Sequence, residues 1–183
     1  MVNENEIPQG WHRHKNGGGL VQDTAHVTES AWVSGDAWVS GNAWVYGNVR
    51  VYGNARVSGN VRVYGDAWVS GNARVYGNAR VYGNAWVSGN ARVYGDAQVY
   101  GNAQVYGNAW VYGNAWEQSP LYIQGSRHAL CNSRKGHIAI GCHEHSFEYW
   151  KEHYKAIGRA EGYTAEQVKE YDQLIDLFIA IGK

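Results

Sequence analysis

The chain has 183 residues with 16 basic and 16 acidic side chains, so its formal net charge is zero at pH 7. This balance argues against non-specific attraction of the whole molecule to nucleic acid or to an anionic membrane surface. The sequence contains no run of eighteen apolar residues, so we expect no membrane-spanning helix and no membrane partner.

The expected compartment is a reducing one. Residues 1–8 contain no basic region followed by an apolar run, so we expect no secretory signal. The two cysteines, Cys131 and Cys142, are most simply free thiols in a chain without such a signal. We therefore expect a cytoplasmic protein.

Residues 1–20 are expected to form a tail and a cap for the repeats that follow. Trp11 stands ahead of the glycine cluster Gly17–Gly19. The open end of a repeat array exposes unpaired backbone and core, which must be covered. We predict that Trp11 covers the first coil. A metal site at His12 and His14 is the less favoured alternative.

Residues 31–114 consist of fourteen consecutive six-residue units without insertion or deletion. Each unit reads Ala or Val, a variable residue, Val, Ser or Tyr, Gly, and Asn or Asp. Side chains alternate along extended backbone, so the Ala and Val positions point inward and the variable position points outward. The Gly-Asn or Gly-Asp pair predicts a corner in every unit. Units this small must stack to bury their apolar side, which predicts a β-solenoid over residues 21–118.

The repeat resembles that of the hexapeptide-repeat proteins, in which an aliphatic residue is followed four positions later by a small one. Val33 and Ala37 occupy these positions here, and the pattern continues to Val111 and Ala115. The resemblance implies a mainly β fold, a left-handed parallel β-helix of triangular cross-section. With three units in each coil, residues eighteen apart lie above one another at a spacing of roughly 4.8 Å.

Stacking at this spacing turns the outward positions into three columns. The first contains Trp32, Arg50, Trp68, Trp86 and Gln104. The second contains Trp38, Arg56, Arg74, Arg92 and Trp110, with Tyr76 and Tyr94 beside it. The third contains Trp44, Arg62, Arg80 and Gln98, and we expect Trp116 to continue it.

The arginine positions suggest a ligand site. An anion, such as a nucleotide phosphate or the acidic patch of another protein, would neutralise Arg56, Arg74 and Arg92, while Tyr76 and Tyr94 would stack on a base. Arg62 and Arg80 form a shorter set of the same kind. The structural alternative is that these arginines lie over aromatic rings of neighbouring coils through cation–π attraction.

The outward tryptophans suggest self-association, because so large an aromatic surface marks an interface. The interface candidates are Trp32, Trp38, Trp44, Trp68, Trp86 and Trp110. The resemblance also implies homo-oligomers, since hexapeptide proteins often form trimers, and it implies acyltransferase activity as an alternative. Such enzymes use a loop histidine, whereas this chain has no inserted loop in its repeats and no histidine between His26 and His128. We therefore favour a non-catalytic protein.

Residues 119–183 are expected to form an α+β cap. Residues 121–123 and 137–140 are rich in strand-forming side chains, and they flank a predicted loop over residues 125–136. Two helices should follow, the first over about residues 147–161.

The helix ends carry specific signals. Ser146 is placed to cap the first helix and Gly162 to end it. Thr164 and Gln167 form a capping box that opens the second. We expect the resulting helical hairpin to lie on the last coil.

The two ends of the chain resemble proteins of viral or mobile-element origin. Residues 119–128 and 140–150 are similar to the closing segment of uncharacterised phage and prophage proteins, and the segment around His14 and residues 16–19 is similar to the start of bacterial and prophage hexapeptide proteins. The resemblance implies a phage or prophage origin, a location in the host cytoplasm, and no assigned reaction.

A zinc site is the sharpest chemical candidate in the C-terminal segment. His128 and Cys131 form one pair of soft ligands with a spacing of three, and Cys142 and His145 form a second pair ten residues further on. Against zinc, residues three apart on a strand point to opposite sides of the sheet. A nucleophilic Cys142 paired with His128 or His145 is the other alternative.

The favoured function is therefore a non-catalytic binding or assembly protein. Its outward Trp, Tyr and Arg side chains would form the recognition or oligomer surface, and the partner would be an unidentified protein or nucleotide. The alternative is the binding of a nucleotide or nucleic acid through the stacked Arg and aromatic rows.

Overall fold

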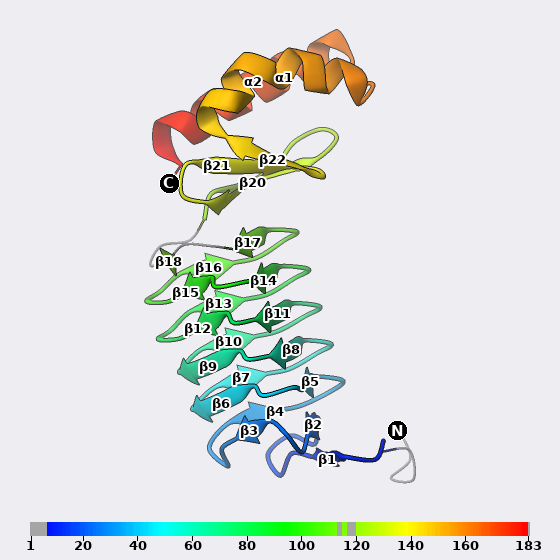
Figure 1. The fold of residues 1–183 in the computed structure, drawn as a ribbon, viewed down its shortest axis with the longest axis vertical. Helices are drawn as coiled ribbons and strands as arrows, with labels where there is room; N and C mark the ends of the chain where they lie inside the picture. Colours follow the sequence, from blue (N-terminus) through cyan, green and yellow to red (C-terminus); the bar gives the residue numbers. More distant parts are fainter. Residues whose placement is uncertain (1–6, 113–114, 117–119, 183) are drawn as a thin grey trace.

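A computed structural model shows a parallel β-solenoid that carries a small sheet and two helices at one end (Figure 1). The structure describes residues 7–112, the backbone of residues 115 and 116, and residues 120–182. The mainly β architecture expected from the repeat is confirmed.

Each coil contributes one strand to each of three parallel sheets. The β2–β17 sheet contains β2 (Leu20–Gln22), β5 (Trp38–Val39), β8 (Arg56–Gly59), β11 (Arg74–Gly77), β14 (Arg92–Tyr94) and β17 (Trp110–Tyr112), with β1 (Trp11–Arg13) added antiparallel to β2. The β4–β16 sheet contains β4 (Trp32–Val33), β7 (Arg50–Val51), β10 (Trp68–Val69), β13 (Trp86–Val87) and β16 (Gln104–Val105). The β3–β18 sheet contains β3 (His26–Val27), β6 (Trp44–Gly47), β9 (Arg62–Gly65), β12 (Arg80–Val81), β15 (Gln98–Val99) and β18 (Ala115–Trp116).

Paired residues in neighbouring solenoid strands are eighteen apart in the sequence. Arg74 pairs with Arg56 on one side and with Arg92 on the other, and Arg62 pairs with Arg80. The same register holds in the β4–β16 sheet. The three predicted columns are therefore confirmed as far as Gln98, Gln104 and Trp110.

The register changes at the last coil, which corrects the prediction for Trp116. Gln98 pairs with Ala115, so Trp116 pairs with Val99 instead of continuing the third column. The last regular unit ends at residue 114, and Glu117 stands where the next inward valine would be. At this last coil, the paired residues of neighbouring strands are therefore no longer eighteen apart in the sequence.

The solenoid core consists of valine and alanine. Every inward Val and Ala from Ala31 to Val111 is fully buried. Burying one valine side chain stabilises a fold by about 1.5–3 kcal/mol. The stability of the solenoid is thus distributed evenly over its coils.

Glycine forms the corners. The corner glycines from Gly35 to Gly107 have φ values between +63° and +88°, which residues with a Cβ rarely adopt. The coils also approach closely there, since a Cβ added to Gly59 would lie 2.9 Å from the carbonyl oxygen of Gly77. Both conditions require glycine.

The asparagines that follow the corner glycines form amide ladders, which were not predicted. The Nδ2 group of Asn54 donates to Oδ1 of Asn72 at 3.2 Å, and Asn72 donates to Asn90 at 3.0 Å. On another corner, Asn78 donates to Asp96 at 3.1 Å. These bonds run in the direction of stacking and tie each coil to the next.

Strand β1 and the loop over residues 14–19 cover the N-terminal end of the solenoid. In this loop, the N–H of Gly19 donates to the carbonyl of Val33, and the N–H of Val33 donates to the carbonyl of Asn16. Trp11 lies elsewhere, with its ring 5.2 Å from that of the exposed Trp38. The prediction that Trp11 covers the first coil is therefore wrong, because β1 extends a sheet and directs Trp11 along the outer surface.

The C-terminal module begins with a four-stranded antiparallel sheet. Its strands, in spatial order, are β19 (Tyr122–Gln124), β20 (Ala129–Arg134), β21 (His137–Ile140) and β22 (His143–Ser146). Strands near residues 121–123 and 137–140 are confirmed, whereas the predicted loop between them contains β20, and β22 was not expected. Both unexpected strands carry polar side chains, as in Asn132, which is buried and accepts a hydrogen bond from the N–H of Leu121.

The module ends with helices α1 (Phe147–Ala160) and α2 (Ala165–Ile181). The side chain of Ser146 caps α1, and Thr164 and Gln167 form the capping box of α2, as predicted. The hairpin lies on the far side of the module sheet from the solenoid (Figure 1). The expectation that it lies on the last coil is therefore wrong, because the sheet occupies that place. No helix in the described part of the chain is long and apolar enough to span a membrane.

We expect Gly59→Ala to lower the free energy of unfolding by about 1–3 kcal/mol. The added methyl group would combine a φ of +88° with a 2.9 Å contact to the backbone of Gly77. Gly18→Ala is the matched control, since its φ is +72° but no atom lies within 4 Å of the added Cβ. Urea unfolding followed by circular dichroism compares the two, and equal losses would show that close approach of the coils does not matter.

Candidate functional site

The outward tryptophans are held on rigid sheets and reach into solvent. Trp32 and Trp44 are each 50 % exposed and Trp86 is 43 % exposed. Trp68 is stacked on Trp86, with ring centres 4.8 Å apart, and the guanidinium of Arg50 lies 4.8 Å from the Trp68 ring centre. Aromatic and guanidinium groups therefore contact one another along the columns, as the structural alternative predicts.

Arg56, Arg74 and Arg92 form a continuous arginine column on the β2–β17 sheet. The guanidinium of Arg56 lies 5.6 Å from the ring centre of Trp38, and that of Arg92 lies 4.9 Å from the ring centre of Trp110. Among the described residues, no carboxylate forms an ion pair with a solenoid arginine. Like charges one strand apart repel by roughly 1 kcal/mol in water, so an anionic ligand would relieve this repulsion.

The tyrosines beside the arginine column stack on one another. The ring centres of Tyr76 and Tyr94 are 5.2 Å apart, and those of Tyr94 and Tyr112 are 5.0 Å apart. Partial burial, followed by the proximity of Tyr76, raises the pKa of the Tyr94 hydroxyl. Because these ring faces are turned toward each other, a nucleobase would meet mainly ring edges. This arrangement does not favour the expected stacking of a base on Tyr76 and Tyr94.

A second tyrosine stack ends at a groove near the N-terminal end of the solenoid. The stack consists of Tyr46, Tyr64, Tyr82 and Tyr100, with ring centres 4.8–5.1 Å apart. Tyr46 is its first ring, because Thr28 occupies the position eighteen residues earlier. The groove has a volume of about 720 Å³, and Trp44, Tyr46, Arg62 and His26 contribute to its walls. It therefore combines aromatic rings with a guanidinium group.

The two histidines near the N-terminus have separate partners. His12 lies on the surface with Nδ1 2.8 Å from Oδ1 of Asp23. His14 is buried, and its Nδ1 contacts the backbone of Asn16. They do not belong to a group of three metal-ligating side chains among the described residues.

The structure does not gather the four residues predicted to bind zinc. Cys131 is on the side of the module sheet that faces the solenoid, where its thiol lies 3.5 Å from the carbonyl oxygen of Trp110. His145 is on the helix side and lies edge-on against Trp150. His128 and Cys142 are outside the strands, in the segments before β20 and after β21. Cys131 and His145 therefore cannot share one ion, because they lie on opposite sides of the sheet.

The two thiols differ in accessibility. Burial raises the pKa of the Cys131 thiol to about 12, whereas Cys142 is exposed. Since the thiolate is the reactive and metal-binding form, Cys131 is suited to neither role at neutral pH.

A cavity of about 370 Å³ lies between the module sheet and the two helices. Its apolar walls include Ile140, Trp150 and Ile157, and its polar groups include His128 and His143. The hydroxyl of Tyr171 donates to the carbonyl of His128 at 2.7 Å, which fixes the loop that carries this histidine. An apolar cavity with a few convergent polar groups is typical of small-molecule sites.

Cys142, His143 and Glu161 meet at this cavity, and two of them were missed by the sequence-based prediction. A hydrogen bond from His143 lowers the pKa of the Glu161 carboxyl. The adjacent Cys-His pair was visible in the sequence, but no local pattern indicates that Glu161, eighteen residues after His143, lies beside it.

Comparison with known proteins identifies the repeat. Residues 43–57, 55–71, 73–89, 85–101, 97–113 and 103–118 match the YdcK beta solenoid repeat. Successive matches begin a multiple of six residues apart, in phase with the six-residue unit. The chain is a β-solenoid repeat protein. No curated protein and no solved structure matches this solenoid protein.

We expect one thiol of the native solenoid protein to react rapidly with Ellman's reagent at pH 8. Cys142 is exposed and should react, while Cys131, whose pKa is raised to about 12 by burial, should react only after unfolding. Cys142→Ser should remove the fast phase and Cys131→Ser should retain it. Two fast equivalents from the native wild-type protein would contradict the burial of Cys131.

Proposed function

We propose that this chain is a non-catalytic binding and assembly protein, and that its arginine column recognises an acidic surface of a partner. The observation that carries the proposal is the alignment of Arg56, Arg74 and Arg92 without a neutralising carboxylate among the described residues. The exposed rings of Trp38 and Trp110 frame this column. A row of positive charges beside exposed aromatic rings is typical of surfaces that recognise other proteins.

Both ends of the solenoid are covered, so a partner would bind to the sides of the solenoid. Strand β1 and the loop over residues 14–19 occupy one end, and the module sheet occupies the other (Figure 1). End-to-end stacking would require one of these covers to move. The outward columns are therefore the surfaces of the solenoid that a partner can reach without rearrangement.

The finer features of the proposal come from the sequence. We propose a left-handed helix of the hexapeptide type and a phage or prophage origin with function in the host cytoplasm, on the basis of the unbroken repeat and the resemblance of the terminal segments. Self-association through the outward tryptophans, which are Trp32, Trp38, Trp44, Trp68, Trp86 and Trp110, stays a prediction. The acyltransferase alternative has less support, because the catalytic histidine of that pattern has no counterpart between His26 and His128.

We expect the triple variant Arg56→Gln, Arg74→Gln and Arg92→Gln to bind fluorescent poly-L-glutamate at least about tenfold more weakly than wild type at low salt. Glutamine is a conservative choice, since Gln98 and Gln104 occupy the same outward position in other columns. Wild-type binding should weaken steeply as salt is added, because the contacts are exposed charges. Fluorescence anisotropy measures both effects.

The matched control changes the same number of charges elsewhere. Arg50, Arg62 and Arg80 lie on the other two sheets, and their replacement by glutamine should leave poly-L-glutamate binding within about threefold of wild type. Equal losses in both triple variants would mean that net charge, not the column, determines binding. No binding by the wild-type protein would overturn the proposal.

A second candidate function is the binding of a nucleotide in the groove beside Tyr46. No ring of the described residues stacks on the N-terminal side of Tyr46, since Thr28 lies below it, and its side chain is 38 % exposed. Arg62 lines the same groove and could bind phosphate. A nucleotide in this groove would stack its base on the ring of Tyr46 and place its phosphate at the guanidinium of Arg62.

We expect ATP to quench the tryptophan fluorescence of the wild-type protein through Trp44, and we expect Tyr46→Ser or Arg62→Gln to weaken binding at least about fivefold by removing stacking or the phosphate contact. Serine is native to this position in other units, as at Ser40. Arg80→Gln is the control, because Arg80 lies one coil above Arg62. Quenching that survives both groove substitutions would exclude this groove as the nucleotide site.

A further inference from the structure

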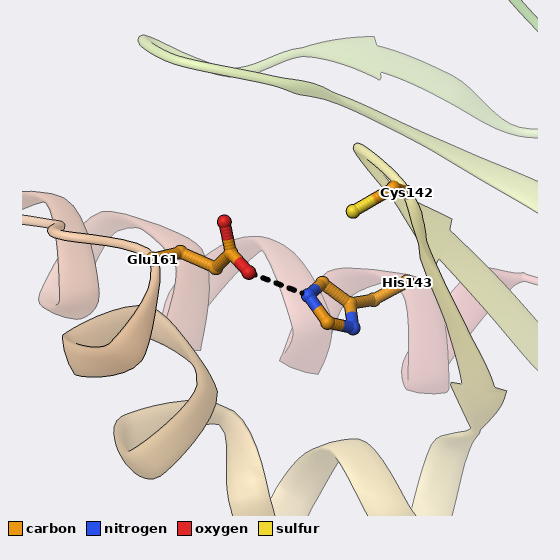
Figure 2. A group of neighbouring side chains, drawn as sticks. All are labelled: Cys142, His143 and Glu161. Atoms are coloured by element: carbon orange, nitrogen blue, oxygen red, sulfur yellow. Dashed lines mark hydrogen bonds and ion pairs between the residues drawn. The ribbon is translucent and has the colours of Figure 1, made fainter.

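Three metal-ligating side chains converge beside the module cavity (Figure 2). The Sγ atom of Cys142, a ring nitrogen of His143 and a carboxylate oxygen of Glu161 lie within 4.8 Å of one another. We propose that these three residues bind a zinc ion. The proposal concerns a different part of the molecule from the recognition surface and does not depend on it.

The local fold brings these residues together. Gly141, with a φ of +58°, allows the tight turn between β21 and β22, and this turn places Cys142 immediately before the first residue of β22, His143. Helix α1 begins directly after β22 and runs back along it, so its C-cap residue Glu161 lies over the start of the strand. The backbone N–H of Glu161 is bonded to the carbonyl of Ile157, which fixes its position.

The donor set suits zinc better than the common alternatives. Thiolate, imidazole and carboxylate are the ligands that zinc uses in proteins, whereas calcium and magnesium prefer oxygen alone. In a tetrahedral zinc site, neighbouring ligand atoms are roughly 3.5 Å apart. The observed separations are within 4.8 Å, and Nε2 of His143 is 2.9 Å from Oε1 of Glu161. Small side-chain rotations would therefore complete the geometry, with the ion replacing the hydrogen bond.

The orientation of the imidazole argues against a nucleophilic triad of the same residues. A triad requires the thiol at one ring nitrogen and the orienting carboxylate at the other. Here Nε2 of His143 is bonded to Glu161, and Figure 2 shows the sulfur of Cys142 on the same side of the ring, with Nδ1 turned away. The three donor atoms thus surround one point, which is the arrangement that an ion needs.

Three protein ligands leave one position of a tetrahedral zinc ion open. All three residues line the cavity of about 370 Å³, whose wall includes Ile140 and Trp150. The open position would therefore hold water or the anionic head of a small ligand with an apolar body. Structural zinc sites are normally closed by a fourth protein ligand, so the open position points to an exchangeable site.

The first experiment uses the full-length wild-type protein after removal of metal. We expect one equivalent of Zn²⁺ to bind in competition with a chromophoric chelator, and one equivalent of Co²⁺ to give the near-ultraviolet absorption of a thiolate–cobalt bond. Bound Zn²⁺ should also protect Cys142 from Ellman's reagent. Absence of stoichiometric zinc, or a cobalt complex without the thiolate band, would overturn the proposal without reference to any variant.

Substitutions then assign the ligands. Cys142→Ser, His143→Asn and Glu161→Gln should each weaken zinc binding at least about tenfold. The matched controls Glu152→Gln and His153→Asn change the same residue types at an exposed and a half-buried position of α1, and should stay within about twofold of wild type. Circular dichroism verifies that each variant is folded. Unchanged affinity in Glu161→Gln, or a loss in His145→Asn equal to that in His143→Asn, would refute this ligand set.

Discussion

The close approach of successive coils at their corners is the constraint on which the solenoid depends. At Gly59 the backbone has a positive φ and leaves no room for a methyl group beneath the corner above. The same residue type recurs every six positions, so strands of successive coils meet in the same register as far as β17. A core of only valine and alanine can then fill the interior, because the backbone spacing never varies.

This constancy determines what the outside can do. Side chains at the two outward positions of each unit lie directly above their counterparts in the next coil, and in places like residues meet, as in the arginine column and the two tyrosine stacks. Where an arginine lies between tryptophans, as Arg50 does between Trp32 and Trp68, its contact with the ring is attractive and needs no further partner. Where arginines are next to arginines, like charges repel one another along the surface, and an external anion would relieve this repulsion.

The solenoid was predictable from the sequence because its six-residue repeat determines the position of every strand and corner. The strands, the inward valines, the corner glycines and the three columns all follow from a spacing of six residues. The ends were not predictable in the same way. Trp11 was predicted to cover the open end of the first coil, although strand pairing directs it along the outer surface. Strand β22 carries no apolar side chain to mark it as a strand.

The metal-ligating residues of the C-terminal module were harder still to predict from the sequence. A spacing of three between His128 and Cys131, repeated in Cys142 and His145, indicates a shared ion only if both pairs reach the same side of a sheet. They do not, because Cys131 packs toward the solenoid and His145 toward the helices. Glu161 lies beside Cys142 and His143 because helix α1 runs back along β22 and ends at this residue. Its position depends on where the helix ends, and no ligand motif in the sequence marks it.

The repeat of eighteen residues also makes the molecule adjustable in length. Gain or loss of a whole coil through recombination between near-identical units would move the two ends of the solenoid apart or together by about 4.8 Å and leave every column in phase. A change of six residues would instead rotate the module by a third of a revolution relative to the arginine column. Length variants of this protein should therefore differ by whole coils wherever the module and the column must face the same partner.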